Sequence, residues 1–409
     1  MNITLILPIL ITVFGSYLLF KLRFFFIMHP IKSAKCFASA ISDRETRRSF
    51  CLALAGTLGV GNIFGVAAAI MIGGPGSVFW LVLSSFFSMI IKYAETSMVC
   101  ENVSSGGGMS EALKKIFKKS GNKLSAIYAL FTVILALFMG AAMQTSALLD
   151  VAENTVGLNA LIGGFISLIL FLPCLIFGAK KIENITEILI PLTTILYIIA
   201  CFVVILMNFS SLLPTCFMII KSALSPRAIT TGAFFIAIKE GFARGMLSNE
   251  AGIGTSALAH SKIKHKDSAT AGILGMCEVL FDTTLLCTLT AMAILVSVND
   301  INAFSTPMSL VYTAFTSTLG KPFGYILLAM VFAFAYSTVI CWYYYGYKCI
   351  CLHFAPLLPL YMIVFPTMIL FSSLIKVENL LYLTDTTMLI MAFITIFSII
   401  KSINKIKSP

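Results

Sequence analysis

Two short stretches of the chain combine glycine with polar residues inside otherwise apolar sequence. The first, AGTLGVGNIFG, covers 55–65, and the second, SNEAGIGTS, covers 248–256. Each glycine in a helix interior costs about 0.8–1.0 kcal/mol relative to alanine, so both stretches are predicted to interrupt a helix. An interrupted helix leaves backbone N–H and C=O groups that lipid cannot satisfy, whereas a bound ion and a polar solute can satisfy them. Glycines also allow helices to pack closely, but packing alone gives no role to the amide of Asn62.

The composition of the whole chain is that of an integral membrane protein. Of the 409 residues, 59% are hydrophobic and 11% are charged, whereas a soluble domain carries about 25% charged residues. The net charge of +11 does not indicate a nucleic-acid partner, because the basic residues lie between apolar runs, where orientation signals are found. The 11 cysteines are interpreted as small buried hydrophobic residues and the 4 histidines as interfacial residues.

The apolar segments predict about eleven membrane crossings that fill nearly the whole chain. A crossing helix needs about 20 apolar residues. The N-terminal segment has neither a basic n-region nor a small-residue cleavage site, so it is predicted to be a retained helix rather than a signal peptide. The predicted crossings cover 3–27, 51–72, 77–99, 124–149, 159–179, 185–207, 229–260, 269–297, 320–346, 354–375 and 379–400.

The charges of the loops predict how the chain is oriented. By the positive-inside rule, basic loops face the cytoplasm, so the N-terminus is expected outside and the C-terminus in the cytoplasm. An odd number of crossings agrees with ends on opposite sides. We therefore expect a multi-pass protein of a bacterial-type inner (plasma) membrane. Basic residues occupy every second loop, at 28–50, 113–123, 180–181, 262–266, 348 and the C-terminal tail.

The two interrupted stretches occupy corresponding positions in two halves of the chain. If the N-terminal helix, residues 1–28, is set aside, each stretch lies in the first helix of a block of five crossings. The blocks cover 51–207 and 229–400 and should run in opposite directions across the bilayer. Helix breaks at matching positions of inverted halves indicate the binding site of a secondary transporter.

Four motifs resemble signatures of the alanine or glycine:cation symporter family. They are LAGTLGVGNIFGVAAAIMIGGPGSVFWLVLSSFFSMIIKYAE, MGAAMQTSALLD, GFARGMLSNEAGIGTSALAH and AFAYSTVICWYYYG, in that order along the chain. The resemblance implies membership of the amino acid–polyamine–organocation superfamily. It implies an all-α, leucine-transporter-like fold of five plus five inverted helices, preceded by one extra helix. The implied activity is sodium-driven uptake of alanine, glycine or similar small amino acids.

A zwitterionic amino acid needs donors for its carboxylate and acceptors for its ammonium. Backbone N–H groups around Gly59 and Gly61 can bind the carboxylate, aided by the positive end of a half-helix. Free carbonyls of 248–252 can accept from the ammonium. By family resemblance Gln144 and Asn249 face the substrate, although either amide can also serve as a bond between helices. The predicted substrate-binding residues are Thr57, Gly59, Gly61, Asn62, Gln144, Asn249, Gly252 and Trp342, the last as a wall that limits side-chain size or, alternatively, as an interfacial tryptophan.

The resemblance also implies a sodium site that joins the first broken helix to a later one. Hard oxygen ligands suit such an ion. A neutral ligand set favours sodium over a proton, because no side chain has to titrate. The alternative is that the hydroxyls of Ser337 and Thr338 form hydrogen bonds with carbonyls of their own helix. The matching positions are Ala55, Leu58 and Phe334 for carbonyls, and Ser337 and Thr338 for hydroxyls.

Charged residues inside the crossings are costly and need a role. Glu250 lies at the second break, where it can cap a half-helix. Arg244 lies one turn further out, and Asp282 lies deep in a later crossing. Lys92 and Glu95 are three residues apart and can pair. Structural roles are predicted for Arg244, for Asp282 and for the pair, with an external gate as the alternative for Arg244.

The sequence departs from the family pattern at five positions that are predicted to cluster around the pocket. These departures put the identity of the substrate in doubt more than the mechanism. Two further functions stay open: a proton-coupled carrier or exchanger with the same fold, and a sensor that binds an amino acid without transporting it. No enzyme motif such as His-Glu-x-x-His or Gly-x-Ser-x-Gly occurs, and the oligomeric state is not indicated. The departures are Val60, Phe64, Leu247, Cys341 and Tyr347.

Overall fold

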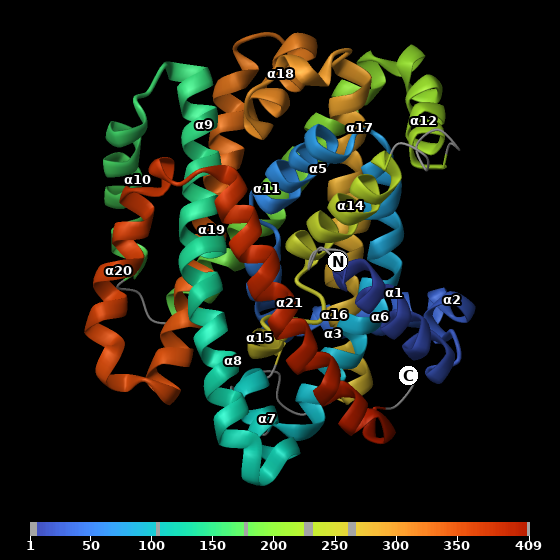
Figure 1. Ribbon diagram of the computed structural model, residues 1–409, viewed down its shortest axis with the longest axis vertical. Coiled ribbons are helices and arrows are strands. Elements are labelled where there is room, and N and C mark those ends of the chain that lie inside the picture. The colour runs from blue at the N-terminus through green and yellow to red at the C-terminus, as the bar shows by residue number, and fades with distance from the viewer. Residues whose placement is uncertain (1–5, 104–106, 176–178, 225–231, 261–266, 407–409) are drawn as a thin grey trace.

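The computed structural model describes residues 6–103, 107–175, 179–224, 232–260 and 267–406, and over these ranges the chain is helical without strands. Helices of very different lengths pack into one body (Figure 1). The basic loop 262–266 and the starts of the predicted crossings 3–27 and 229–260 lie outside the described residues. The α-helices are α1 (Ile6–Lys21), α2 (Phe25–Met28), α3 (Pro30–Ser42), α4 (Arg44–Thr57), α5 (Val66–Gly73), α6 (Gly76–Asn102), α7 (Gly108–Phe117), α8 (Gly121–Leu135), α9 (Gln144–Val156), α10 (Ala160–Leu175), α11 (Ala179–Met207), α12 (Phe209–Leu224), α14 (Ala233–Asn249), α15 (Ala257–His260), α16 (Ser268–Val279), α17 (Thr288–Ser297), α18 (Pro307–Leu319), α19 (Phe323–His353), α20 (Leu358–Leu370) and α21 (Val377–Ser402).

Most predicted crossings coincide with helices that are long and apolar. By length and composition, the described residues contain six helices able to cross a membrane, or seven if the bent pair that joins α4 to α5 is one crossing. Three further predicted crossings coincide with the shorter apolar helices α1, α10 and α20. The predicted crossing 229–260 corresponds to α14 and α15. The total of eleven and the division into blocks 51–207 and 229–400 remain predictions.

The helices α12 and α18 are among those that lie where no crossing was predicted. They occupy the upper end of the molecule in Figure 1. The sequence of α18 lies between the predicted crossings 269–297 and 320–346, yet Thr306 and Ser309 form a capping box and Pro307 begins the helix. These residues satisfy the first free N–H groups, so a short helix forms between the longer ones.

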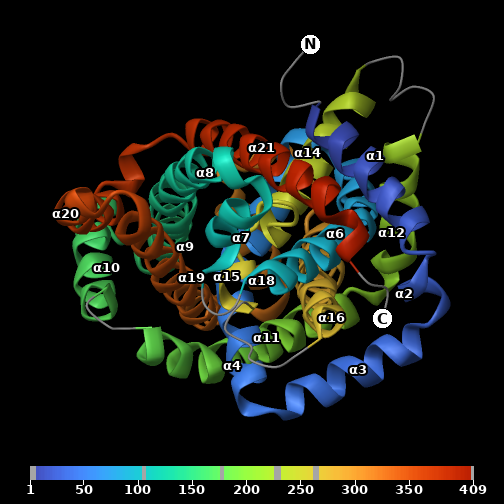
Figure 2. The ribbon, with the colours of Figure 1, turned by 90° about the horizontal axis from the view of Figure 1, so that it is seen from below.

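The two predicted breaks lie among the helices at the centre of the molecule. α6 packs against both α14 and α16, while α4 packs against α11 and α19. α19 also packs against α8 and α9. Figure 2, seen from below, shows α15 among the other helices and α4 beside α11 and α3. The residues of both breaks are buried. The break between α4 and α5 and the break after α14 are therefore enclosed by protein, where irregular backbone is tolerated at membrane depth.

Both breaks have the backbone geometry that their sequences predict. α4 ends at Thr57, and the helical segment Gly61–Gly73 leaves it at 46°. α14 ends at Asn249, and Glu250 follows with a φ of 54°. Gly252 has a φ of 81°, which a side chain would strain, so glycine is required there. The positive φ of a non-glycine residue such as Glu250 is uncommon, and surrounding contacts have to hold it.

Three wide π-helical turns interrupt the helices near these breaks. They are η2 (Gly61–Gly65), η4 (Ala136–Met143) and η5 (Leu280–Cys287). η2 contains Asn62, η4 directly precedes Gln144 and η5 contains Asp282. π-turns of this kind occur frequently at functional sites, because they redirect the side chains that follow.

Candidate functional site

The first break is held against α19 by a hydrogen bond between two predicted sodium ligands. The hydroxyl of Thr338 donates to the carbonyl oxygen of Ala55 over 2.9 Å. Gly59 follows in the break, and a Cβ there would lie only 2.6 Å from Oγ1 of Thr338. Leu58 lies directly before it and is buried. The close approach of the two helices therefore depends on the absence of a side chain at residue 59.

Gln144 binds the same break from the other side. Its Oε1 accepts a hydrogen bond of 2.9 Å from the backbone N–H of Val60, and its Nε2 donates to the carbonyl of Met139. A Cβ at Gly59 would lie 2.7 Å from this Oε1. The predicted residues Gly59, Gln144 and Thr338 thus come together at one point of the break. If the side chain of Gln144 turned away, the backbone N–H of Val60 would be free to donate to a carboxylate.

Trp342 forms a wall beside this point. Its indole N–H donates to the carbonyl of Gly56, and the side chain is fully buried. A Cβ at Gly140 would lie 2.3 Å from Cβ of Trp342, so the ring is packed tightly between α4 and η4. This burial excludes the alternative of a tryptophan at the membrane interface.

Other predicted ligands near the break bond their own helices. The hydroxyl of Ser337 donates to the carbonyl of Phe334 at 2.9 Å and to that of Ala333 at 3.1 Å. The hydroxyl of Thr57 donates to the carbonyl of Leu54. Of the two hydroxyls predicted to bind sodium, Thr338 alone contacts the first broken helix in this arrangement.

Asp282 connects the two breaks, a role that the sequence interpretation did not assign to it. Its carboxylate accepts from the amide of Asn62 in η2 and from the hydroxyl of Ser248 near the end of α14. Thr283 donates to the same carboxylate over 2.7 Å. The amide of Asn62, predicted to face the substrate, is therefore directed at η5. Gly61, next to it, faces α14, since a Cβ there would have the carbonyl oxygen of Leu247 as its nearest neighbour at 3.8 Å.

The second break is held by two side chains of α6. The ammonium of Lys92 donates to the carbonyls of Asn249 at 3.0 Å and Glu250 at 3.3 Å. One turn along α6, Glu95 accepts from the N–H of Gly252 at 2.8 Å. These carbonyls, which were predicted to be free for an ammonium group, are thus bonded to the protein's own ammonium. The predicted pairing of Lys92 with Glu95 is replaced by an ion pair of Lys92 with Glu278, 3.7 Å apart.

Asn249 lies at the junction of these contacts. Its Oδ1 accepts from the N–H of Ala251, while its Nδ2 is buried without a hydrogen-bond partner among the described residues. The hydroxyl of Thr255 donates to the carboxylate of Glu250. His260 was interpreted as interfacial, which is wrong, because its ring is buried against the carboxylate of Glu278.

Arg244 is bound inside the protein by acidic side chains. Its guanidinium pairs with Asp385 of α21 and lies 3.5 Å from Glu240, one turn earlier in α14. The pairing joins α14 to α21, in line with the structural role predicted for Arg244. The contacts that the buried charged residues make were not predicted from the sequence. The one feature of the sequence that could have indicated them is the position of these charges inside apolar segments.

Four of the five departures from the family pattern are buried beside the breaks. Val60 and Phe64 belong to the first break, and Leu247 lies close to Gly61 and Gly65. Cys341 donates to the carbonyl of Leu52 in α4. Tyr347, by contrast, is exposed and packs on Tyr343, so its predicted place near the pocket is wrong. The error arises because closeness in sequence was taken as closeness in space, whereas Tyr347 lies on the opposite face of α19.

Solved structures with the same fold are transporters. The chain is similar to MhsT in complex with L-phenylalanine, with a TM-score of 0.64 at 13% identity over 85% of this chain and 87% of that one. It is also similar to Mhp1, a nucleobase-cation-symport-1 family transporter, with a TM-score of 0.52 at 13% identity over 84% and 74%. At these identities the similarity concerns the fold, which is the leucine-transporter-like fold predicted from the motifs.

Curated relatives extend the similarity to the sequence. The chain is 31% identical to the sodium/alanine symporter AgcS of Methanococcus maripaludis over 83% of this chain and 79% of that protein. It is 28% identical to the probable sodium/glutamine symporter GlnT of Bacillus subtilis over 96% and 84%. The model of the sodium:alanine symporter family matches residues 1–407. Relatives and family are transporters rather than enzymes, and the chain described here belongs to the sodium:alanine symporter family.

Proposed function

We propose that the protein is a sodium-coupled symporter that imports small neutral amino acids, such as alanine or glycine, by alternating access. The observation that carries this proposal is the convergence of Gly59, Gln144 and Thr338 at the first break. A carbonyl, a hydroxyl and a backbone N–H there provide neutral oxygen ligands for a cation next to a donor for a carboxylate. The orientation with the N-terminus outside and the C-terminus in the cytoplasm is part of the proposal.

The proposed sodium site is built around the contact of Thr338 with Ala55. Both groups present oxygen atoms, the ligand type that hard cations prefer. Carbonyls of Leu58 and Phe334 and the hydroxyl of Ser337 would complete the set, which requires Ser337 to turn from the carbonyl of Phe334. Because these ligands come from α4, the break and α19, bound sodium would hold the first broken helix against α19.

The proposed substrate site lies beside the cation. N–H groups from Gly59 to Gly61 would bind the carboxylate, and Gln144 and Asn249 would accept from the ammonium. Thr57, Asn62 and Gly252 complete the proposed set. Trp342 would limit the side chain of the substrate, because the ring has no room to move toward Gly140. A wall in this position would favour alanine, glycine or serine, whereas the name of the relative GlnT makes glutamine the competing substrate.

Coupling means that sodium and substrate favour the same state. The coupling free energy is typically about 1–3 kcal/mol and is reciprocal, so the substrate should tighten sodium binding by the same factor. Purified protein in liposomes should therefore take up labelled alanine, glycine or serine when an inward sodium gradient is applied. Labelled glutamine should be tested in the same uptake assay.

The same vesicles separate the alternatives. Uptake driven by a pH gradient without sodium would support a proton-coupled carrier instead. Counterflow that is independent of every cation gradient would support an exchanger. Substrate binding without any counterflow would support a sensor. A lack of any sodium effect on substrate affinity would reject the proposed coupling.

A further inference from the structure

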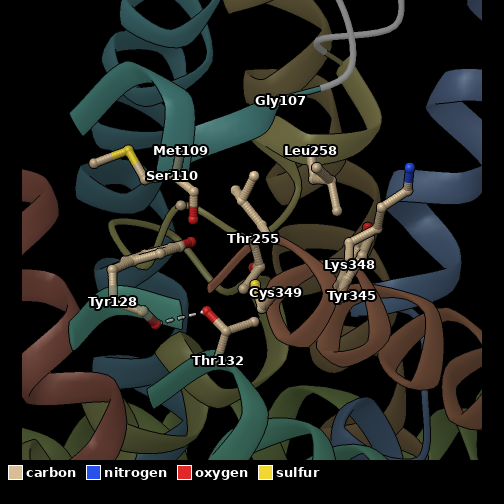
Figure 3. Close-up of a pocket in the computed structure, with 12 residues that line it drawn as sticks. Gly107, Met109, Ser110, Tyr128, Thr132, Thr255, Leu258, Tyr345, Lys348 and Cys349 are labelled. Atoms are coloured by element: carbon tan, nitrogen blue, oxygen red, sulfur yellow. Dashed lines mark hydrogen bonds between the residues drawn. The ribbon is translucent and has the colours of Figure 1, made fainter. Parts of the chain in front are cut away.

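A cavity of about 160 Å³ lies between α7, α8, α15 and α19. Figure 3 shows Ser110 and Tyr128 on one side of it, Tyr345 and Lys348 on the other, and Thr255 between them. Lys348 is exposed, so the cavity opens to the surface beside this residue. The volume has room for several water molecules or one small solute. By the predicted orientation, α7 and Lys348 belong to the cytoplasmic side.

Tyr345 separates this cavity from the first break. Its ring lines the cavity, and a Cβ at Gly56 would lie 3.3 Å from Cε2 of the same ring. The ring also contacts Trp342, with centroids 5.7 Å apart and an interplanar angle of 73°. One aromatic side chain therefore faces the cavity on one side and the wall of the candidate substrate site on the other.

The polar groups around the cavity suit a zwitterion. The hydroxyl of Ser110 is buried and has no hydrogen-bond partner among the described residues, whereas the hydroxyl of Tyr345 lies toward Gly56 and Cys341. Leaving such a group as that of Ser110 unbonded costs free energy, so a ligand that accepts or donates there is favoured. The charge of Lys348 at the opening attracts a carboxylate, while the hydroxyl oxygen of Ser110 can accept from an ammonium group.

We propose that this cavity is a transit site for the amino acid on its way to the cytoplasm, and that the ring of Tyr345 is the gate between it and the first break. The inference rests on the proposed function, because it takes the first break as the place from which the substrate leaves. When the ring swings away from Gly56, the substrate passes into the cavity. When the ring returns, the substrate is released past Lys348.

Two native cysteines lie on either side of the proposed gate and provide the test. Cys341 lies one turn before Tyr345 and contacts α4, whereas Cys349 lies one turn after it and lines the cavity. Cys351 is exposed and is not among the residues that line the cavity, so it serves as the matched control. Variants that keep only one of these cysteines are placed in inside-out vesicles and treated with a membrane-impermeant thiol reagent.

The gate predicts a distinct pattern of labelling. With Tyr345 in place, Cys349 should react with the thiol reagent and Cys341 should not. Tyr345→Ala should raise the labelling rate of Cys341 at least about tenfold, equivalent to a shift of about 1.4 kcal/mol in gate opening. Tyr345→Phe keeps the ring and should leave that rate nearly unchanged. Equal labelling of Cys341 in all three backgrounds would overturn the gate.

Alanine tests the transit site in the same vesicles. A saturating concentration should slow the labelling of Cys349 but not of Cys351, and Ser110→Ala should reduce this protection because it lacks the unpartnered hydroxyl. No protection of Cys349 would overturn the transit site. Normal labelling of Cys351 in each variant shows that the protein is folded and oriented. The labelling of Cys341 is measured without sodium and without substrate, so failure of the gate and failure of sodium-driven uptake are separate results.

Discussion

The hydroxyl of Thr338 donates a 2.9 Å hydrogen bond to the backbone carbonyl of Ala55 and so joins α19 to the first broken helix. The bond lies between residues far apart in the sequence, at the point where α4 is about to end. The same two oxygen atoms are available to a cation that enters between the helices. In the proposed mechanism the contact therefore has two forms, one without and one with an ion, and mutation should shift the balance between them.

Thr338→Val removes the hydroxyl while keeping the shape of the side chain. We expect the sodium concentration for half-maximal alanine uptake to rise about tenfold, because a polar contact of this kind contributes about 0.5–1.5 kcal/mol or more to binding. Sodium titration of initial uptake rates measures this effect. Ser337→Ala is the matched comparison and should act less strongly, since that hydroxyl bonds its own helix. An equal or larger effect of Ser337→Ala would show that Ser337 is the principal ligand.

Gly59→Ala should abolish transport. The added Cβ would lie 2.6 Å from Oγ1 of Thr338 and 2.7 Å from Oε1 of Gln144, so the break has to open. Overpacking of this kind typically costs about 1–3 kcal/mol. Gly61→Ala is the control, because its nearest neighbour would be 3.8 Å away. Uptake assays and melting curves in detergent should rank the Gly59 variant below the Gly61 variant, and the reverse order would contradict the described packing.

Gln144→Ala should weaken substrate binding more than it weakens sodium binding. The change leaves the N–H of Val60 without its partner, at a cost of about 1–3 kcal/mol if no water replaces the amide. It also removes a proposed acceptor for the substrate ammonium. The KM for alanine at saturating sodium should rise. If KM stays at its original value, Gln144 serves only as a bond between helices.

Lys92→Met should destabilise the protein strongly. The change leaves the buried carboxylate of Glu278 without its ammonium partner and frees the carbonyls of Asn249 and Glu250. Removing one partner of a buried pair costs about 3–5 kcal/mol. Lys92→Met combined with Glu278→Gln should recover part of the loss. Lys115→Met breaks the exposed pair with Glu111 and should cost less than about 1 kcal/mol.

Melting curves in detergent compare the stabilities of Lys92→Met, of the double variant Lys92→Met with Glu278→Gln, and of Lys115→Met. A double variant no more stable than Lys92→Met would place the loss in the freed carbonyls rather than in the unpaired carboxylate. A Lys92→Met variant as stable as Lys115→Met would show that the second break does not depend on the ammonium.

The breaks themselves could be predicted from the sequence because their cause is local. Glycines and an Asn or Glu inside an apolar segment weaken a helix wherever the rest of the chain lies, and α4 and α14 end close to the expected positions. The contact of Thr338 with Ala55 matches a pair that the family motifs implied. The helix α18 was missed, since its capping residues stand in a stretch that also has the composition of a loop.

The partners of the buried charges could not be predicted from spacing. Lys92 and Glu95 are close enough along one helix to pair, but the carbonyls of Asn249 and Glu250 and the carboxylate of Glu278 compete for the same ammonium. Asp282 likewise bonds Asn62 and Ser248 from two other helices. Which of several partners prevails depends on how the helices are brought together, and a single sequence contains no record of that arrangement.

The wide turn η5 has a consequence for the length of its helix. A π-turn holds one residue more than an α-helical turn, so a deletion of one residue within Leu280–Cys287 would leave a regular helix of unbroken hydrogen bonds. The helical segments before and after the turn would keep their positions, because the deletion removes only the residue that the turn accommodates. The side chains within the turn would change direction, since neighbouring residues of an α-helix differ by about 100°. The carboxylate of Asp282, which lies inside the turn, would then no longer be directed at both Asn62 and Ser248, and the protein would gain a straighter helix at the expense of the link between its two breaks.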